Sequence, residues 1–189
     1  MQSRYVVCAI IASVSSSSAA EILQWYDGDN NGSLWLSDST IEPYADLSGQ
    51  TLWWADLDWA NLHHSNLQEA NLMYAHLIGA NLAHSSLNSV NFYGAILSEA
   101  NLSFTNLSYA NLRFTDVFAA NLFSADLTDA NLTGMYNWDQ AFWLRAFYNQ
   151  NTIFPTGMDP ESFGMILIPA PATLALLSVA VFATRRRRS

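Results

Sequence analysis

Residues 60–82 read ANLHHSNLQEANLMYAHLIGANL, with a leucine at every fifth position. An α-helix advances about 500° over five residues, so these leucines would spiral around it and line no single side. On a straight β-strand an odd step of five places successive leucines on opposite faces. A chain that bends by about a quarter turn every five residues keeps them together, on the inside of a square coil. Four such pentads then close one coil of twenty residues.

The same period extends well beyond this stretch. Eighteen consecutive pentads are centred on every fifth residue from 47 to 132; sixteen centres are leucine and the others are Phe92 and Val117. A small residue stands two places before nearly every centre, with Gln50 and Val90 as exceptions, and Asn or Asp usually lies between. Stacked at the inter-strand spacing of about 4.8 Å, the pentads give about 4.5 coils and a rod roughly 20 Å long. The sequence therefore predicts an all-β solenoid with leucine in four interior columns.

The A(N/D)LXX pattern, as in ADLDWANLHHSNLQEANL from 55 to 72, resembles the repeat of the pentapeptide-repeat proteins. The resemblance implies a right-handed quadrilateral parallel β-helix, which we place at 45–134. A solenoid exposes unpaired backbone at both ends, so terminal caps are expected. We assign 21–44 to an N-terminal capping segment and 135–165 to an aromatic C-terminal cap, in which 140–148 is expected to form a short amphipathic helix.

The first residues have the features of a secretory signal peptide, which we place at 1–20. Arg4 precedes a short apolar core, and Ser18 and Ala20 suit the small positions before a cleavage site. The single cysteine, Cys8, lies in this segment. The processed chain would therefore have neither a disulfide nor a cysteine metal site.

The last residues, 166–189, predict a membrane helix. Their apolar run ends in four consecutive arginines, which indicates that this end stays in the cytoplasm. The segment resembles the PEP-CTERM sorting signal, with alanine in place of the central glutamate of its Pro-Glu-Pro-like motif. The resemblance implies export to the cell envelope or the exterior, with export and sorting machinery as partners and an exosortase-like enzyme cleaving the signal. The residues that carry it are Pro169, Ala170, Pro171, Arg185, Arg186, Arg187 and Arg188.

Outward aromatic side chains gather on one predicted face, in the two positions after every fourth centre. Stacked in a column, they are suited to contacts with another protein or with sugar rings. Cover by the chain's own cap, or mutual support within the sheet, is an equal alternative. The residues of this predicted contact face are Trp53, Trp54, Tyr74, Tyr93 and Phe114.

The stretch DGDNNGSLWLSD, from 27 to 38, matches the start of a calcium-binding loop. Its candidate ligands for weak Ca²⁺ binding are Asp27, Asp29, Asn31, Ser33 and Asp38. A plain capping turn is the favoured alternative, because Asp, Asn and Gly also form turns. No other cofactor is expected.

His64 and His84 are twenty residues apart, so they are expected about 5 Å from one another on adjacent coils. Without a third ligand in their column, solvated surface histidines are favoured over a metal site. Serine, histidine and aspartate are scattered by the repeat itself, and we identify no catalytic set. We therefore expect a protein that is not an enzyme.

The chain has sixteen acidic residues against seven arginines and no lysine. Such a surface repels nucleic acid. We expect an exported structural or binding module whose partner is an envelope protein or polysaccharide. The alternative is an acidic rod that imitates DNA and inhibits a topoisomerase, as some pentapeptide-repeat proteins do. Its charge has the right sign, since 45–134 holds eight acidic residues and one arginine, but an exported protein would not meet that target.

Overall fold

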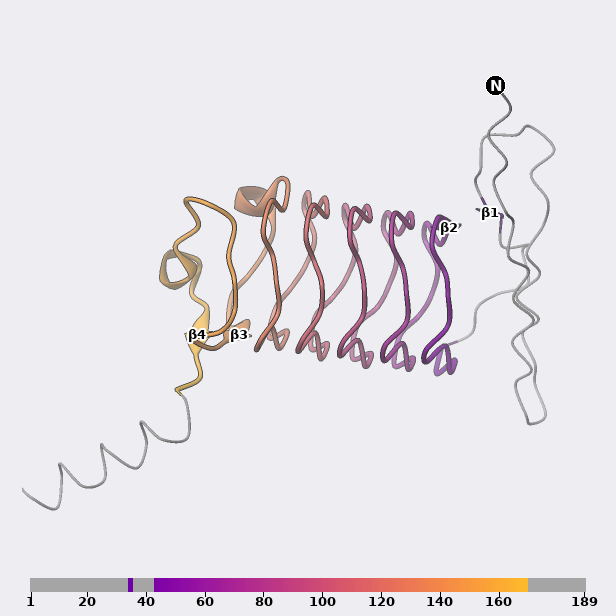
Figure 1. The fold of residues 1–189 in the computed structure, drawn as a ribbon, viewed down its shortest axis with the longest axis horizontal. Coiled ribbons are helices and arrows are strands. Elements are labelled where there is room, and N and C mark those ends of the chain that lie inside the picture. Colours follow the sequence, from indigo (N-terminus) through magenta and orange to yellow (C-terminus); the bar gives the residue numbers. More distant parts are fainter. Residues whose placement is uncertain (1–33, 36–42, 170–189) are drawn as a thin grey trace, which may run out of the picture.

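The computed structural model describes residues 34–35 and 43–169 of the 189-residue chain. In it the chain winds into a stack of similar coils (Figure 1). The predicted signal peptide, the calcium loop ligands Asp27, Asp29, Asn31, Ser33 and Asp38, and the segment from Ala170 onward lie outside the described residues. So do all four arginines of the predicted sorting signal.

Each coil takes twenty residues, as the period predicts. Asn71 forms a parallel bridge with Asn91, and Asn91 with Asn111. The same twenty-residue register holds for every pentad from Asp46 to Asp116. Four pentads thus bring the chain back above its starting point, one hydrogen-bonded layer further along.

The pentad 70–74 shows why this arrangement is stable, because each of its five N–H groups has a partner. The N–H of Ala70 donates to Leu67 in the preceding turn at 3.1 Å, and that of Asn71 donates to Gln50 of the preceding coil at 2.8 Å. Those of Leu72 and Tyr74 donate to the following coil at 2.8 and 2.9 Å. The fifth, from Met73, donates to the side-chain oxygen of Asn71 at 3.3 Å. A buried backbone group without a partner is costly, so the frequent Asn or Asp is explained by this last bond.

The corners of the coil depend on one backbone conformation. The residue two places after each centre has a positive φ, for example 59° at Trp54 and 63° at Gly79. The third residue of a type II turn requires this sign of φ. The carbonyl of Leu52 accepts the N–H of Ala55 across such a turn at 3.2 Å. These turns bend the chain and carry the outward side chains.

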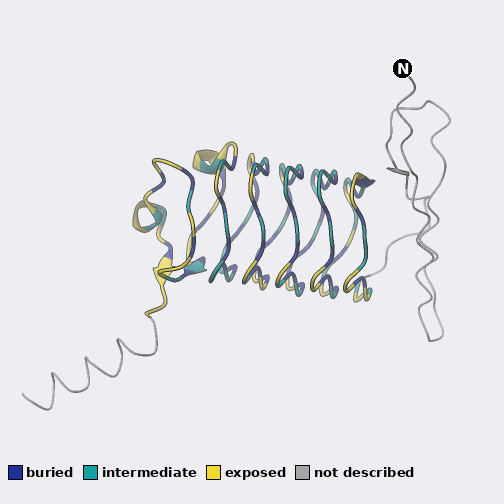
Figure 2. Cartoon of the chain, in the orientation of Figure 1, coloured by how far each residue is buried: buried dark blue, intermediate teal, exposed yellow. Residues whose placement is uncertain are grey.

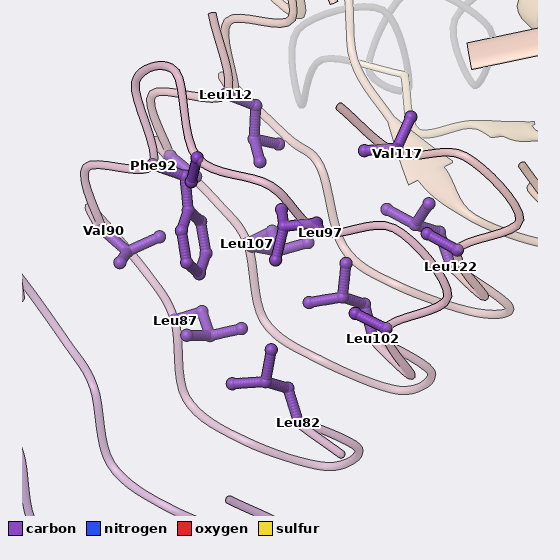
Figure 3. Packing of buried hydrophobic residues seen from close by; sticks show 14 of the residues in the cluster. Leu82, Leu87, Val90, Phe92, Leu97, Leu102, Leu107, Leu112, Val117 and Leu122 are labelled. Carbon is purple, nitrogen blue, oxygen red and sulfur yellow. The ribbon is translucent and has the colours of Figure 1, made fainter. Parts of the chain in front are cut away.

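The interior is filled by the pentad centres. Every centre from Leu57 to Leu132 is at most 2 % exposed, and Phe92 occupies a leucine position without reaching solvent. Figure 3 shows these side chains pointing into the coil from all sides. Most of the small residues two places earlier are buried beside them, with Ala45 and Ala60 only partly buried, and Val90 fits there as well. Figure 2 shows the buried residues lining the coils and exposed ones at the turns and the C-terminal end.

Longer strands and helices are few among the described residues. Strand β1 (Leu34–Trp35) pairs in parallel with β2 (Ala55–Asp56) and so adds a layer before the first complete coil. Near the other end lie the 3₁₀-helices η1 (Trp138–Gln140) and η2 (Pro160–Phe163). Strand β3 (Phe147–Tyr148) pairs in parallel with β4 (Ile166–Leu167).

The C-terminal region continues the solenoid in modified form, and the amphipathic helix predicted at 140–148 is wrong. The register lengthens to 21 residues at Asn121, which bridges Phe142, and to 22 at Asn131, which bridges Ile153. Helix η1 occupies the first of these longer corners. Trp143 takes the place of an interior leucine and is 1 % exposed. Its indole Nε1–H donates to the carbonyl of Trp138 at 2.7 Å, which satisfies the one polar group that it buries.

The predicted membrane helix begins at residue 166, but Ile166 and Leu167 do not belong to a helix. They form β4, and the N–H of Ile166 donates to Ala146 at 2.8 Å. This pairing satisfies backbone groups of the last turn of the solenoid, and both side chains stay exposed. Within residues 34–35 and 43–169, no helix has the length and hydropathy needed to cross a membrane.

Candidate binding faces of the solenoid

The square coil has four faces, which we name by their interior residues. Face A is centred on Leu47 and face B on Leu52; face C is centred on Leu57 and face D on Leu62, each continued at twenty-residue steps. Faces A and C are therefore opposite one another, as are B and D. Every outward side chain of residues 45–134 can be assigned to one of them.

Face B carries the aromatic residues predicted as a contact face, and the structure brings four of them together. The rings of Trp54 and Tyr74 are stacked with centroids 4.7 Å apart. Tyr93 continues the column, 5.7 Å from Tyr74 and 5.4 Å from Phe114, with edge-to-face geometry. Trp53 is 45 % and Trp54 51 % exposed. Tyr74, Tyr93 and Phe114 are half-buried, so the face presents a continuous aromatic column that is partly exposed to solvent.

Two glycines accommodate this column. A Cβ atom at Gly94 would lie 2.6 Å from the ring of Tyr74, and one at Gly134 would lie 2.5 Å from the ring of Phe114. Each ring thus leans over the glycine of the following coil. Both glycines also have a positive φ, so a side chain there would be strained as well as crowded.

Arg113 lies in the same column. Its guanidinium carbon is 5.7 Å from the ring centre of Tyr93 and 5.6 Å from that of Phe114. Both distances fall in the range of cation–π attraction. The exposed guanidinium therefore lies against two aromatic rings of face B.

Face D carries a second column, half of which the sequence reasoning missed. The rings of His64 and His84 are stacked 4.9 Å apart, close to the predicted 5 Å. Phe104 follows at 4.8 Å, as its register indicates. The column also includes Tyr44, Phe123 and Phe142. The twenty-residue spacing from His64 predicts the place of Tyr44. Phe123 and Phe142 occupy other pentad positions, so the spacing does not predict their ring contacts with the column.

A third histidine adjoins the pair. The ring of His63 is 4.1 Å from that of His64, in edge-to-face geometry. Desolvation, followed by repulsion from His63 and His84, lowers the pKa of His64 below its ordinary value. The three imidazole rings thus pack against one another. No group of three or more possible metal ligands occurs in the described part of the chain.

The acidic residues of the coils occupy only two faces. Within residues 45–134, faces B and D carry no acidic residue, and faces A and C carry four each. Face A holds Asp46, Glu69, Asp126 and Asp129, and face C holds Asp56, Asp58, Glu99 and Asp116. The pKa of Asp46 is lowered chiefly by the hydroxyl and N–H of Ser48. The rod therefore alternates acidic and aromatic faces around its circumference.

Regular asparagine ladders coincide with the aromatic faces. On face B the amide of Asn111 donates to Asn91 at 2.9 Å, and that of Asn91 to Asn71 at 3.4 Å. On face D an equivalent ladder links Asn61 to Asn121 at 3.3 to 3.5 Å. On faces A and C the corresponding position varies among several residue types. Faces B and D are thus regular along the rod, and A and C are not.

Comparison with known proteins agrees with this geometry. A family model for pentapeptide repeats matches residues 44–77, 55–94, 85–122 and 100–134. A pentapeptide-repeat protein from the Arabidopsis thaliana thylakoid lumen is 27 % identical with a TM-score of 0.51, over 53 % of this chain and 69 % of that one. One from Nostoc is 32 % identical with a TM-score of 0.37, over 60 % of this chain and 84 % of that one. HetL, a Nostoc protein involved in the regulation of heterocyst differentiation, is 27 % identical with a TM-score of 0.34, over 65 % and 68 %.

Comparison with curated proteins gives no match. The repeat matches and the solved structures are sufficient to assign the fold, which in this family is a right-handed quadrilateral β-helix. The chain belongs to the pentapeptide-repeat family.

Proposed function

We propose that this protein is an exported, non-enzymatic binding module of the cell envelope and that face B is its contact surface. The observation that carries the proposal is the partly exposed aromatic column on a face without acidic residues. Exposed apolar patches of this kind mark interaction sites, and aromatic residues and arginine contribute most to binding at such sites. The acidic faces A and C flank the column and disfavour acidic surfaces that approach from the side.

Export is supported by the sequence at both ends. The signal-peptide features of 1–20 and the sorting-signal features of 166–189 are those of a chain that is carried out of the cytoplasm and held at the membrane by its C-terminal segment before cleavage. Fractionation of the producing cell, with sequencing of both ends of the mature protein, tests this step. An intact N-terminus in the cytoplasm would contradict it.

Binding is tested with the full chain against polysaccharides and proteins isolated from the envelope of the producing cell. Replacing Trp54 and Tyr74 by alanine is expected to weaken the affinity for the partner by about tenfold or more, since aromatic anchors that become buried dominate such contacts. Tyr109→Ala is the matched control, because Tyr109 occupies the same pentad position on face A and is 65 % exposed. Equal effects of both changes would remove face B as the contact surface.

Imitation of DNA is a second candidate, and one observation favours it: acidic residues form two strips on opposite faces, as phosphates line the two strands of a duplex. The strips are sparse, because DNA carries one charge per about 1.7 Å and a rod of about 20 Å would need roughly a dozen. A gyrase supercoiling assay, combined with the fractionation above, separates the candidates. Inhibition by a cytoplasmic protein would replace the envelope proposal.

A further inference from the structure

Arg113 is the single basic residue among 45–134 if the histidines are neutral, and it lies on a face without carboxylates. The nearest acidic residue along the chain, Asp116, belongs to face C. Its carboxylate accepts the N–H of Phe118 at 3.0 Å and the amide of Asn137 at 2.8 Å. On its own face the guanidinium therefore has aromatic neighbours and no counter-charge.

The guanidinium is also held in position. Tyr93 of the preceding coil and the adjacent Phe114 lie on it at cation–π distances. The backbone N–H of Arg113 donates to the side chain of Asn111 at 3.3 Å, which fixes the turn that carries it. A charged group that is placed in this way loses less conformational entropy when it binds a ligand.

Groups that bind hydroxyls surround this cation. The amides of the face B ladder recur at the coil spacing of about 4.8 Å. Asn91 and Asn111 each use one of their two amide hydrogens in the ladder. Tyr93 and Thr133 occupy the same column position as Arg113, one coil before and one coil after it. The surface thus offers periodic hydrogen-bonding groups and aromatic rings around one positive charge.

We propose that face B binds an acidic polysaccharide and that Arg113 pairs with one of its sugar carboxylates. A guanidinium forms two parallel hydrogen bonds to a carboxylate, which a neutral sugar does not offer. A polymer with many hydroxyls and spaced carboxylates matches one cation among periodic amides. An acidic peptide with a carboxylate on every residue matches less well, because its closely spaced charges would also lie beside the acidic residues of faces A and C. This inference rests on face B being the contact surface.

The test is a titration of the full chain with deacylated gellan, a polysaccharide in which only some of the sugars are uronic acids, and with the same polymer after its carboxyl groups have been reduced to alcohols. The native protein is expected to bind the acidic polymer at least tenfold more tightly than the reduced one. Arg113→Gln is expected to weaken binding to the acidic polymer about tenfold and leave the reduced polymer unaffected. Arg113→Lys keeps the charge without the two parallel hydrogen bonds, so its affinity for the acidic polymer should lie between those of the native protein and Arg113→Gln. Arg145→Gln, a change of an exposed arginine on face D, is the matched control and should have no effect.

Equal binding of the two polymers, or full binding by Arg113→Gln, would overturn the inference. Tighter binding of polyglutamate, lost in Arg113→Gln, would replace the polysaccharide by an acidic peptide. The proposed function is tested separately: if Trp54→Ala and Tyr74→Ala abolish binding of an envelope partner that Arg113→Gln still binds, face B remains the contact surface and only the acidic ligand is wrong. Near-native circular dichroism and melting temperature of each variant show that a loss is not due to unfolding.

Discussion

The coils of residues 45–134 and the terminal coil that follows them form the same backbone with different side chains. In the regular coils leucine fills the interior, and bridges join residues twenty apart. In the terminal coil Trp143 and Tyr148 take the leucine places, and bridges join residues 21 or 22 apart. The extra residues are accommodated at corners, and the hydrogen-bonded faces stay aligned. Interior volume and corner length can therefore vary at an end, where no further coil has to match them.

The largest expected effect comes from removing interior volume in each region. Leu102→Ala, in the middle of the stack, is expected to lower the free energy of unfolding by about 2–5 kcal/mol for the whole rod. Trp143→Ala removes more volume, but only the short segment that ends in β4 lies beyond its coil, so the terminal coil is expected to open while the others stay folded. Hydrogen exchange read by mass spectrometry distinguishes them. Uniform loss of protection in Trp143→Ala would show that the two regions unfold as one.

A smaller effect separates backbone strain from crowding within the regular coils. Gly49 and Gly79 have φ of 65° and 63°, but a Cβ at Gly49 meets no atom of the described residues within 4 Å and one at Gly79 meets Trp59 at 2.3 Å. Gly49→Ala is expected to cost about 1 kcal/mol through strain alone, and Gly79→Ala about 2 kcal/mol or more because the ring must move. Urea denaturation measures both. In a Trp59→Ala background the two costs should become equal, and a persisting difference would contradict the assignment to Trp59.

Corner hydroxyls give a third, smaller contrast. The hydroxyl of Ser85 donates to the carbonyl of Leu62 at 2.6 Å, as Thr152 does to Leu127 at 2.9 Å in the terminal coil. Among the described residues, the buried hydroxyl of Ser65 has no partner. Ser85→Ala is expected to cost about 1 kcal/mol, whereas Ser65→Ala should be neutral or stabilising by up to about 1 kcal/mol. Thermal unfolding of the two variants measures the contrast, and equal destabilisation would refute it.

The smallest expected effect is a dependence on pH that arises in the regular coils, where the face D column contains histidines. In the terminal coil the same column ends in Phe142, which has no titratable group. Because the folded-state pKa of His64 is below its ordinary 6.5, the unfolded chain binds more protons just below that pH. The contribution to stability is present above pH 6.5 and is lost as the pH falls from there to the folded-state pKa. His64→Gln should reduce the change in melting temperature between pH 7.5 and 5.5, and an unchanged slope would exclude His64 as its source.

The regular coils were predictable because one requirement repeats eighteen times. A five-residue period is incompatible with a helix or a flat strand, so Leu62 and its equivalents have to point into a bent path. The same period places Trp54 above Tyr74 and His64 above His84, which the ring distances confirm. Their use in binding stays a prediction.

The terminal coil was missed because its two extra residues break the period and its centres are aromatic. Ala141 and Ala146 still stand two places before Trp143 and Tyr148, which is the repeat's own signal at a shifted register. The apolar pattern of 140–148 was interpreted as a helix instead. No local pattern indicates that β4 pairs with β3, since that contact depends on the path of the connection between them, which contains η2.

Four pentads to a turn also constrain how a gene of this kind can lengthen. Duplicating one pentad would shift every later residue to the neighbouring side of the square, so Arg113 would leave the side that carries Trp54. Duplicating four pentads would restore the alignment and extend each side by one rung. Gains and losses in steps of twenty residues therefore change the reach of such a rod and preserve the chemistry of each side.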